Sequence, residues 1–178
     1  KLLFPFLAIL LLLGGCNRGA DNGSSAIDMA AQLTVGIVYN ANAVSIRGGP
    51  SIDYRIIDTV RRGGMCQIIN YDAGREWQEI SYRGETAYIN SEYLFISEWE
   101  SGAKLVLATV TSSNIINVRV AADQNSAILF RALKGEQYIV SVADQGDGWT
   151  TISFPAGEGY IRSEYITKRE TTIDDALL

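Results

Sequence analysis

Short runs of alternating apolar and polar residues recur along most of this sequence. Residues 35–37 and 44–46 have apolar side chains at a period of two, which is typical of half-buried strands, and a polar turn separates them. Further strands are predicted at residues 56–60, 65–70, 77–82 and 86–89, followed by a helical turn and a last short strand from residue 90 onward. Most of the intervening turns contain glycine, which tolerates backbone conformations closed to other residues. Many short strands with frequent turns predict an all-β fold, either a small barrel or a sandwich.

The same pattern of residues occurs twice, with an offset of 72 positions. Trp149 follows Trp77 by 72 positions, and glycines, arginines and tyrosines around them keep the same offset. No gap is needed from residue 38 to residue 94, and 15 of these 57 positions are identical to their counterparts, which unrelated segments would not show. The chain therefore carries one domain twice.

The repeat sets the predicted domain boundaries. The two domains are expected at residues 35–97 and 105–167, with a linker at 98–104 and a polar tail at 168–178 that is either frayed or a single helical turn. A domain of roughly 60 residues buries only about 60% of its unfolded surface, so contact between the copies is expected to add stability. Trp99 has no tryptophan counterpart in the second copy, and we predict that it packs at the junction of the two domains.

The first residues have the composition of an export signal. A lysine precedes an apolar run from Leu2 to Leu13, which is too short for a bilayer span of about 20 residues. The run ends in Leu13-Gly14-Gly15-Cys16, which resembles the lipobox of bacterial lipoproteins. That resemblance implies a signal peptide at residues 1–15 and a lipid on Cys16, followed by a flexible tether at residues 16–34. The alternative is a short buried apolar N-terminus with an incidental cysteine.

Charge and composition exclude several functions. The chain has 15 Lys and Arg against 20 Asp and Glu, a formal net charge of −5, so it lacks the basic balance that nucleic-acid binding requires. It contains no histidine, which excludes Ser-His-Asp and Cys-His catalysis and the usual zinc sites. We therefore expect no enzymatic activity, no metal and no cofactor. Cys66 stands in a strand-like run, with Tyr138 as its counterpart, and is predicted to be a buried small side chain rather than a reactive thiol.

The repeated residues resemble those of bacterial SH3 (SH3b) domains. The resemblance is carried in the second copy by Asn117-Val118-Arg119, Gly148-Trp149 and the run from Gly159 to Ile166, and in the first copy by Ser45-Ile46-Arg47, the run from Trp77 to Ile80 and the run from Ala87 to Leu94. It implies two tandem small SH3-like β-barrels. It also implies binding, because domains of this family bind peptides, often the peptide or cross-bridge part of the bacterial cell wall, and commonly accompany cell-wall hydrolases.

In an SH3-like barrel the ligand groove is expected between the loop after Arg47 and the loop before Trp77. Aromatic faces offer a large contact area at low entropic cost, and a nearby carboxylate pairs with a ligand amine. The candidate peptide-binding residues are Tyr54, Asp72 and Trp77 in the first copy and Asp123, Asp144, Asp147 and Trp149 in the second. The alternative for the two tryptophans is that they seal the core. Arg47 and Arg119 are expected to tie a loop through salt bridges or carbonyl hydrogen bonds rather than to touch a ligand.

These observations together predict a binding protein of the bacterial cell envelope. A lipid on Cys16 would anchor it to a membrane, and the leading predicted partner is a cell-wall (peptidoglycan) peptide. The alternative is a protein–protein adaptor whose two domains dock an envelope enzyme or complex. No nucleic acid is expected as a partner.

Overall fold

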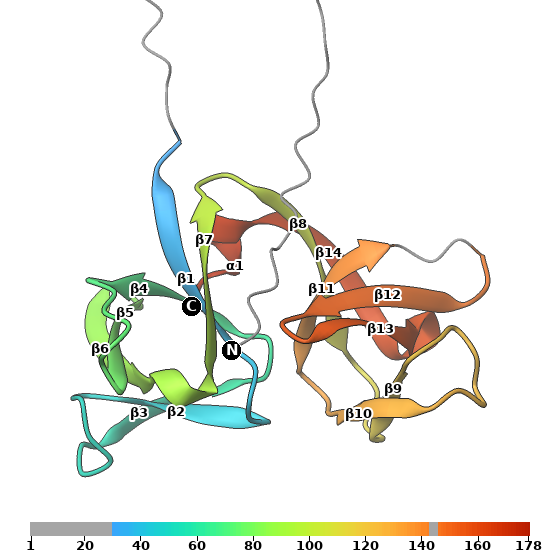
Figure 1. Cartoon of the computed structure of the whole chain (residues 1–178), viewed down its shortest axis with the longest axis horizontal. Helices are drawn as coiled ribbons and strands as arrows, with labels where there is room; N and C mark the ends of the chain where they lie inside the picture. Colours follow the sequence, from blue (N-terminus) through green and yellow to red (C-terminus); the bar gives the residue numbers. More distant parts are fainter. Residues whose placement is uncertain (1–29, 143–145) are drawn as a thin grey trace, which may run out of the picture.

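The protein consists of two units built from antiparallel strands, as seen in a computed structural model that describes residues 30–142 and 146–178 (Figure 1). Each unit contains one seven-stranded sheet, and the strand order is the same in both. The prediction of an all-β fold is confirmed, and the two antiparallel sheets are consistent with SH3-like domains, although over the residues described neither sheet closes into the predicted barrel. The predicted signal peptide, Cys16 and Asp144 lie outside the described residues. Within the described ranges, no helix is long and apolar enough to cross a membrane.

The sheet of the first unit has the spatial order β3-β2-β6-β5-β4-β1-β7. Its elements are β1 (Gln32–Val38), β2 (Ala43–Arg47), β3 (Ile56–Arg61), β4 (Met65–Ile69), β5 (Trp77–Tyr82), β6 (Glu85–Asn90), the 3₁₀ turn η1 (Ser91–Tyr93) and β7 (Leu94–Glu100). The outer strands β3 and β7 are not hydrogen-bonded to each other in the described part of the chain. The sheet is therefore curved around a core without being closed into a continuous barrel.

The second unit repeats this arrangement in the order β10-β9-β13-β12-β11-β8-β14. Its elements are β8 (Lys104–Val110), β9 (Ile116–Arg119), β10 (Ile128–Ala132), β11 (Gln137–Val142), β12 (Trp149–Phe154), β13 (Gly157–Arg162), the 3₁₀ turn η2 (Ser163–Tyr165), β14 (Ile166–Thr172) and the short helix α1 (Ile173–Ala176). The strands β8, β12, β13 and β14 begin and end 72 residues after β1, β5, β6 and β7. The offset seen in the sequence is thus an offset between equivalent strands.

Each unit has its own apolar core. Ile80 and Ile89 are fully buried in the first core, and their counterparts Ile152 and Ile161 are fully buried in the second. Because residues two apart on a strand face the same side of the sheet, the apolar positions at a period of two fill these cores.

Cys66 belongs to the first core. Its side chain is 1% exposed, and its Sγ atom lies 3.4 Å from the carbonyl oxygen of Gly36. Burial raises the pKa of the Cys66 thiol to about 12. The prediction of a buried small side chain is confirmed.

A third apolar cluster joins the two units. Val35 and Met65 of the first unit pack in it with Leu107 of the second unit and with Ile173 of α1, whose side chain is fully buried. Trp99 packs against the same cluster, which confirms its predicted place at the junction. The expected contact between the copies is therefore an apolar interface.

The unit boundaries differ from the prediction. β1 begins inside the predicted tether, and most of the predicted linker at 98–104 is strand, because β7 ends at Glu100 and β8 begins at Lys104. The predicted tail at 168–178 is not frayed: it continues β14 to Thr172 and then forms the single helical turn of α1. Outer strands with one solvated face tolerate polar residues, so a rise in polarity does not mark the end of a strand here.

Candidate binding site between the two units

Two arginines tie the loops that follow β2 and β9. Nη1 of Arg47 donates to the carbonyl oxygens of Ile52 and Tyr54, at 2.8 and 2.7 Å. Nη1 of Arg119 donates to the carbonyl oxygen of Ser126 at 2.6 Å. These bonds confirm the structural role predicted for both arginines.

The candidate residues of the first unit lie in separate environments. Tyr54 is 49% exposed, and its ring covers Gly49 so closely that a Cβ added there would lie 2.3 Å from the ring. Oδ2 of Asp72 lies 3.3 Å from Nε of Arg75, in the turn before β5. Trp77 is half-buried at the first position of β5. Their role in peptide binding stays a prediction.

In the second unit, Asp147 and Trp149 lie together. Oδ1 of Asp147 accepts a hydrogen bond from the backbone N–H of Trp149 at 2.9 Å. The Trp149 side chain is 8% exposed, and the guanidinium of Arg162 lies 5.2 Å from its ring centroid. Asp123 accepts a backbone hydrogen bond within its own exposed loop, and Asp144 lies outside the described residues. This tryptophan contributes to the packing of its unit and exposes little surface to a ligand.

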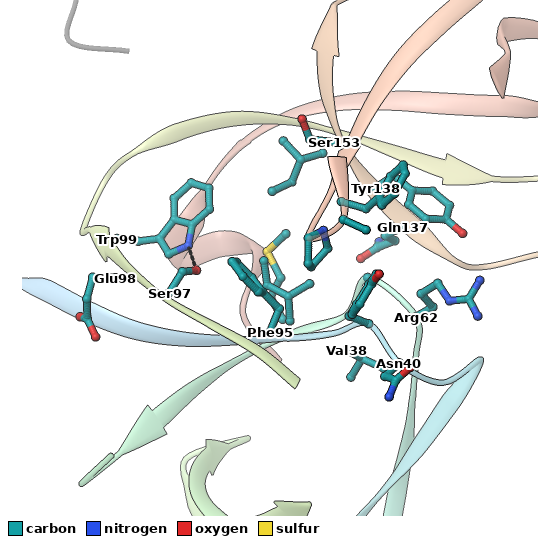
Figure 2. A pocket seen from close by; sticks show the side chains of 18 of the residues that line it. Val38, Asn40, Arg62, Phe95, Ser97, Glu98, Trp99, Gln137, Tyr138 and Ser153 are labelled. Carbon is teal, nitrogen blue, oxygen red and sulfur yellow. Dashed lines mark hydrogen bonds between the residues drawn. The ribbon is translucent and has the colours of Figure 1, made fainter. Parts of the chain in front are cut away.

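A larger feature lies between the two units. A cavity of about 1040 Å³ is bounded by residues of both, which places it at the upper end of the range of roughly 300–1,000 Å³ for ligand pockets. Its aromatic lining residues are Tyr39, Phe95, Trp99, Phe130, Tyr138 and Phe154. Figure 2 shows Trp99 and Glu98 toward one end of this cavity and Arg62 and Asn40 toward the other. The lining of the site therefore combines aromatic side chains with a charged residue toward each of these ends.

Strand β7 forms one wall of this inter-unit cavity. Its alternate residues Phe95, Ser97 and Trp99 all line the cavity, since residues two apart on a strand face the same side. The indole Nε1 of Trp99 donates to Oγ of Ser97 at 2.9 Å, which orients the indole ring (Figure 2).

Oppositely charged residues of the two units meet beside the cavity. Nη1 of Arg62 lies 3.9 Å from Oε2 of Glu136, and the Arg62 guanidinium lies 5.4 Å from the ring centroid of Phe130. The Tyr138 hydroxyl donates to the same Glu136 oxygen at 2.6 Å. Burial, reinforced by this hydrogen bond, raises the pKa of Tyr138. Among the described residues, Nε of Arg62 and Oε1 of Glu136 are buried without a hydrogen-bond partner.

A backbone contact holds the two units in register at this end. The N–H of Gln137 donates to the carbonyl oxygen of Arg62 at 3.0 Å. Gly63, with φ of +81°, packs directly on this contact, and a Cβ added there would lie 1.6 Å from the carbonyl oxygen of Gln137. Only glycine fits this position, on grounds of both conformation and space.

Trp99 was predicted at the junction from the sequence, whereas Arg62, Phe95 and Phe130 were not. A signal that could have found some of these residues is the difference between the copies. Phe130 stands where the first copy has Asp58, and Tyr138 stands where it has Cys66. The two copies present different faces to the junction, so a residue at the junction in one copy need not be of the same type as its counterpart in the other copy.

Comparison with known proteins gives a match to one protein family. Residues 42–95 match the family described as bacterial SH3 domain, and this segment lies in the first unit. The match covers less than half of the chain, and it agrees with the resemblance found in the sequence.

Two curated proteins are similar over parts of their length. The chain is 26% identical over 133 residues to YrvJ of Bacillus subtilis strain 168, assigned by name as an N-acetylmuramoyl-L-alanine amidase, with 73% of this chain and 25% of that protein covered. It is 26% identical over 98 residues to bacteriocin BCN5 of Clostridium perfringens, with 55% of this chain and 11% of that protein covered. The chain thus spans a quarter or less of the length of these relatives.

Two solved structures are similar at low identity. NlpC1 from Trichomonas vaginalis matches with a TM-score of 0.31 and 15% identity, over 86% of this chain and 51% of that one. NlpC2 from the same organism matches with a TM-score of 0.31 and 14% identity, over 78% of this chain and 48% of that one.

Proposed function

We propose that this chain binds peptide material of the bacterial cell wall and does not catalyse its breakdown. The observation that carries the proposal is the aromatic-lined cavity beside a unit that matches the bacterial SH3 domain family. Mostly apolar walls with a few polar groups are typical of ligand-binding cavities. One relative, assigned by name as an N-acetylmuramoyl-L-alanine amidase, adds support.

The acids at the cavity support binding rather than catalysis. Glu98 and Glu100 are both exposed, whereas a carboxyl that acts as a general acid is generally held in an apolar pocket. The chain also has no histidine to serve as a base.

We further propose that a lipid on Cys16 holds the protein at a membrane of the cell envelope. The support is the apolar run that stops at this cysteine. Two or three acyl chains anchor a protein firmly. Metabolic labelling with a radioactive fatty acid should label the parent chain and not the Cys16→Ser variant. An unlabelled parent would overturn the anchor.

Wall binding is tested by co-sedimentation of the purified chain with purified peptidoglycan. Leu129→Asp places a charge on the cavity wall, and a bound ligand would remove water from this charge without supplying a partner, which should weaken binding about tenfold or more. The matched control is Ile57→Asp, which alters the counterpart of Leu129 on β3, a residue of similar exposure away from the cavity. Equal binding by the two variants would exclude the cavity as the site, and a parent that does not sediment would exclude wall binding.

A second candidate function is favoured by several exposed apolar side chains within one short stretch of the first unit. Ile52, Tyr54, Ile56 and Ile57 are 37–73% exposed in the loop after β2 and on the outer strand β3. Exposed apolar patches mark protein–protein contacts, so the protein would act as an adaptor for an envelope enzyme or complex. Photo-crosslinking from position 56 in cells should then give a defined adduct that is absent when Ile57 is replaced by Asp.

A further inference from the structure

The hydrogen-bond register of β7 shows which of its backbone groups are open. The N–H of Tyr39 donates to the carbonyl of Tyr93 at 2.9 Å, and the N–H of Ser101 donates to the carbonyl of Ala31 at 2.8 Å. Both pairs belong to the antiparallel register of β1 and β7, in which hydrogen-bonded pairs alternate with open ones. The backbone groups of Ser97 therefore point toward β1, whereas those of Ile96 and Glu98 point to the other side.

That other side of β7 carries no strand. In the described ranges β7 is the last strand of its sheet and pairs only with β1. It lies on the side of the first unit that faces the second unit (Figure 1). Open N–H and C=O groups on an outer strand are a template for another extended segment.

We propose that the ligand of the inter-unit cavity is an extended peptide segment that pairs as an additional strand with the open edge of β7 at Ile96 and Glu98. This inference rests on the proposed binding of wall peptides and names how the peptide is held. Main-chain hydrogen bonds to the edge supply affinity, and alternate side chains of the segment pack on Phe95 and Trp99.

The charges near this edge indicate one further feature of the segment. Glu98, Glu100 and Lys104 are also among the residues that line the cavity, and the side chains of the two glutamates lie on the face of β7 opposite Phe95 and Trp99. The Glu98 carboxylate already accepts a hydrogen bond from Oγ1 of Thr34 at 2.9 Å, which holds it in place. A paired segment that carries a free amine on this face complements the two carboxylates beside the open edge.

The second unit provides an internal control, because β14 has the same kind of edge without the cavity. The N–H of Thr111 donates to the carbonyl of Tyr165 at 3.0 Å, and the N–H of Ile173 donates to the carbonyl of Ala103 at 2.8 Å. The backbone groups of Glu170, the counterpart of Glu98, therefore also point away from the sheet. None of the described residues that line the cavity belongs to β14.

The test compares Glu98→Pro with Glu170→Pro. Each change removes one N–H from an open edge and leaves the backbone hydrogen bonds within the sheet intact, and proline is tolerated on outer strands. Because Glu98→Pro also removes the carboxylate that accepts from Thr34, Glu98→Gln, which keeps the N–H, measures the part of the effect due to the charge alone. Binding is measured by calorimetry, with peptides released from purified peptidoglycan by an amidase as the probe. We expect Glu98→Pro to weaken binding at least tenfold and Glu170→Pro to leave it within twofold of the parent. Equal effects of the two changes would overturn edge pairing.

Residue-resolved hydrogen exchange on the unaltered chain makes the test independent of any folding defect. When the probe peptides saturate the chain, the amides of Ile96 and Glu98 should exchange at least tenfold more slowly, and those of Lys168 and Glu170 should not change. A parent that binds the peptides without slowing Ile96 and Glu98 would overturn edge pairing and leave wall binding standing. A parent that binds neither the peptides nor whole peptidoglycan would overturn both.

Discussion

Arg62 and Glu136 form an ion pair across the boundary between the two units, with 3.9 Å between Nη1 and Oε2 and with the Glu136 side chain fully buried. Oε2 of Glu136 also accepts hydrogen bonds from the N–H of Leu133 and from the Tyr138 hydroxyl. The Arg62 guanidinium donates to Oδ1 of Asn42 at 2.7 Å. The Glu136 carboxylate is thus hydrogen-bonded by groups of its own unit, and its charge is balanced by Arg62 of the other unit. The stability of the second unit therefore depends on contact with the first.

Arg62→Met should destabilise the protein by about 1–3 kcal/mol, because it leaves a buried carboxylate without its opposite charge. The free energy of unfolding in urea measures this loss. Arg131→Met, at an exposed position of β10, is the control and should change it by less than about 0.5 kcal/mol. Adding Glu136→Gln to Arg62→Met should recover part of the loss, since the buried charge is then gone. A double variant less stable than Arg62→Met would contradict this account.

Gly63→Ala should separate the two units, because its Cβ would overlap the carbonyl oxygen of Gln137. Gly84→Ala is the matched control, since Gly84 has a similar φ of +78° and open space around it. The control bears only the cost of a left-handed residue, about 1–2 kcal/mol. Gly63→Ala adds a steric cost of about 1–3 kcal/mol. Because the two units then move apart, the radius of gyration in small-angle X-ray scattering should increase. Equal radii and stabilities for the two variants would contradict the contact.

Cys66 should be unreactive while the protein is folded. Burial raises the pKa of its thiol to about 12, so very little thiolate exists at a pH of about 8. In a Cys16→Ser background, a thiol-specific chromogenic disulfide should react with Cys66 only after guanidinium chloride is added. Between pH 9, the ordinary pKa, and pH 12 the unfolded thiol loses its proton and the folded one keeps it, so stability should fall as the pH rises. Rapid reaction of the folded chain would contradict the buried position.

Much of the fold follows from positions that repeat. Ile80 and Ile152 are both fully buried, and each lies three residues after a tryptophan that begins a strand. A residue type kept at the same offset marks a position that each unit needs for itself, which is why the strands and cores were predictable. The polar ends of β7 and β14 could not be predicted, because an outer strand with a solvated face has no apolar pattern to mark its end.

The inter-unit cavity could not be predicted because it depends on how two similar units dock. Phe95 and Phe130 lie on opposite units and come to the same cavity only through that docking. Periodicity reports which side of a strand is buried, but it does not report which outer surface meets the other copy. Trp99 was the exception, because a large aromatic residue without a counterpart already indicated an asymmetric contact.

The Asp174 carboxylate connects α1 to the turn between β7 and β8 through hydrogen bonds, and these bonds should stabilise the protein less in acid. The N–H of Gly102 donates to its Oδ2 at 2.6 Å and the Ser101 hydroxyl to its Oδ1 at 2.8 Å. These bonds, that of Gly102 above all, hold the pKa of Asp174 below its ordinary value of 3.8. A lowered pKa in the folded state means that the carboxylate stabilises the fold above a pH of about 4 and that this contribution disappears as the pH falls further.

The measurement is the melting temperature of the parent and of Asp174→Asn between pH of about 6 and 2. The variant should melt lower than the parent near pH 6, because its amide replaces one of the two acceptors, and the gap should close as the parent carboxyl takes up its proton. A gap that stays constant down to pH 2 would show that the charge of Asp174 does not stabilise the junction.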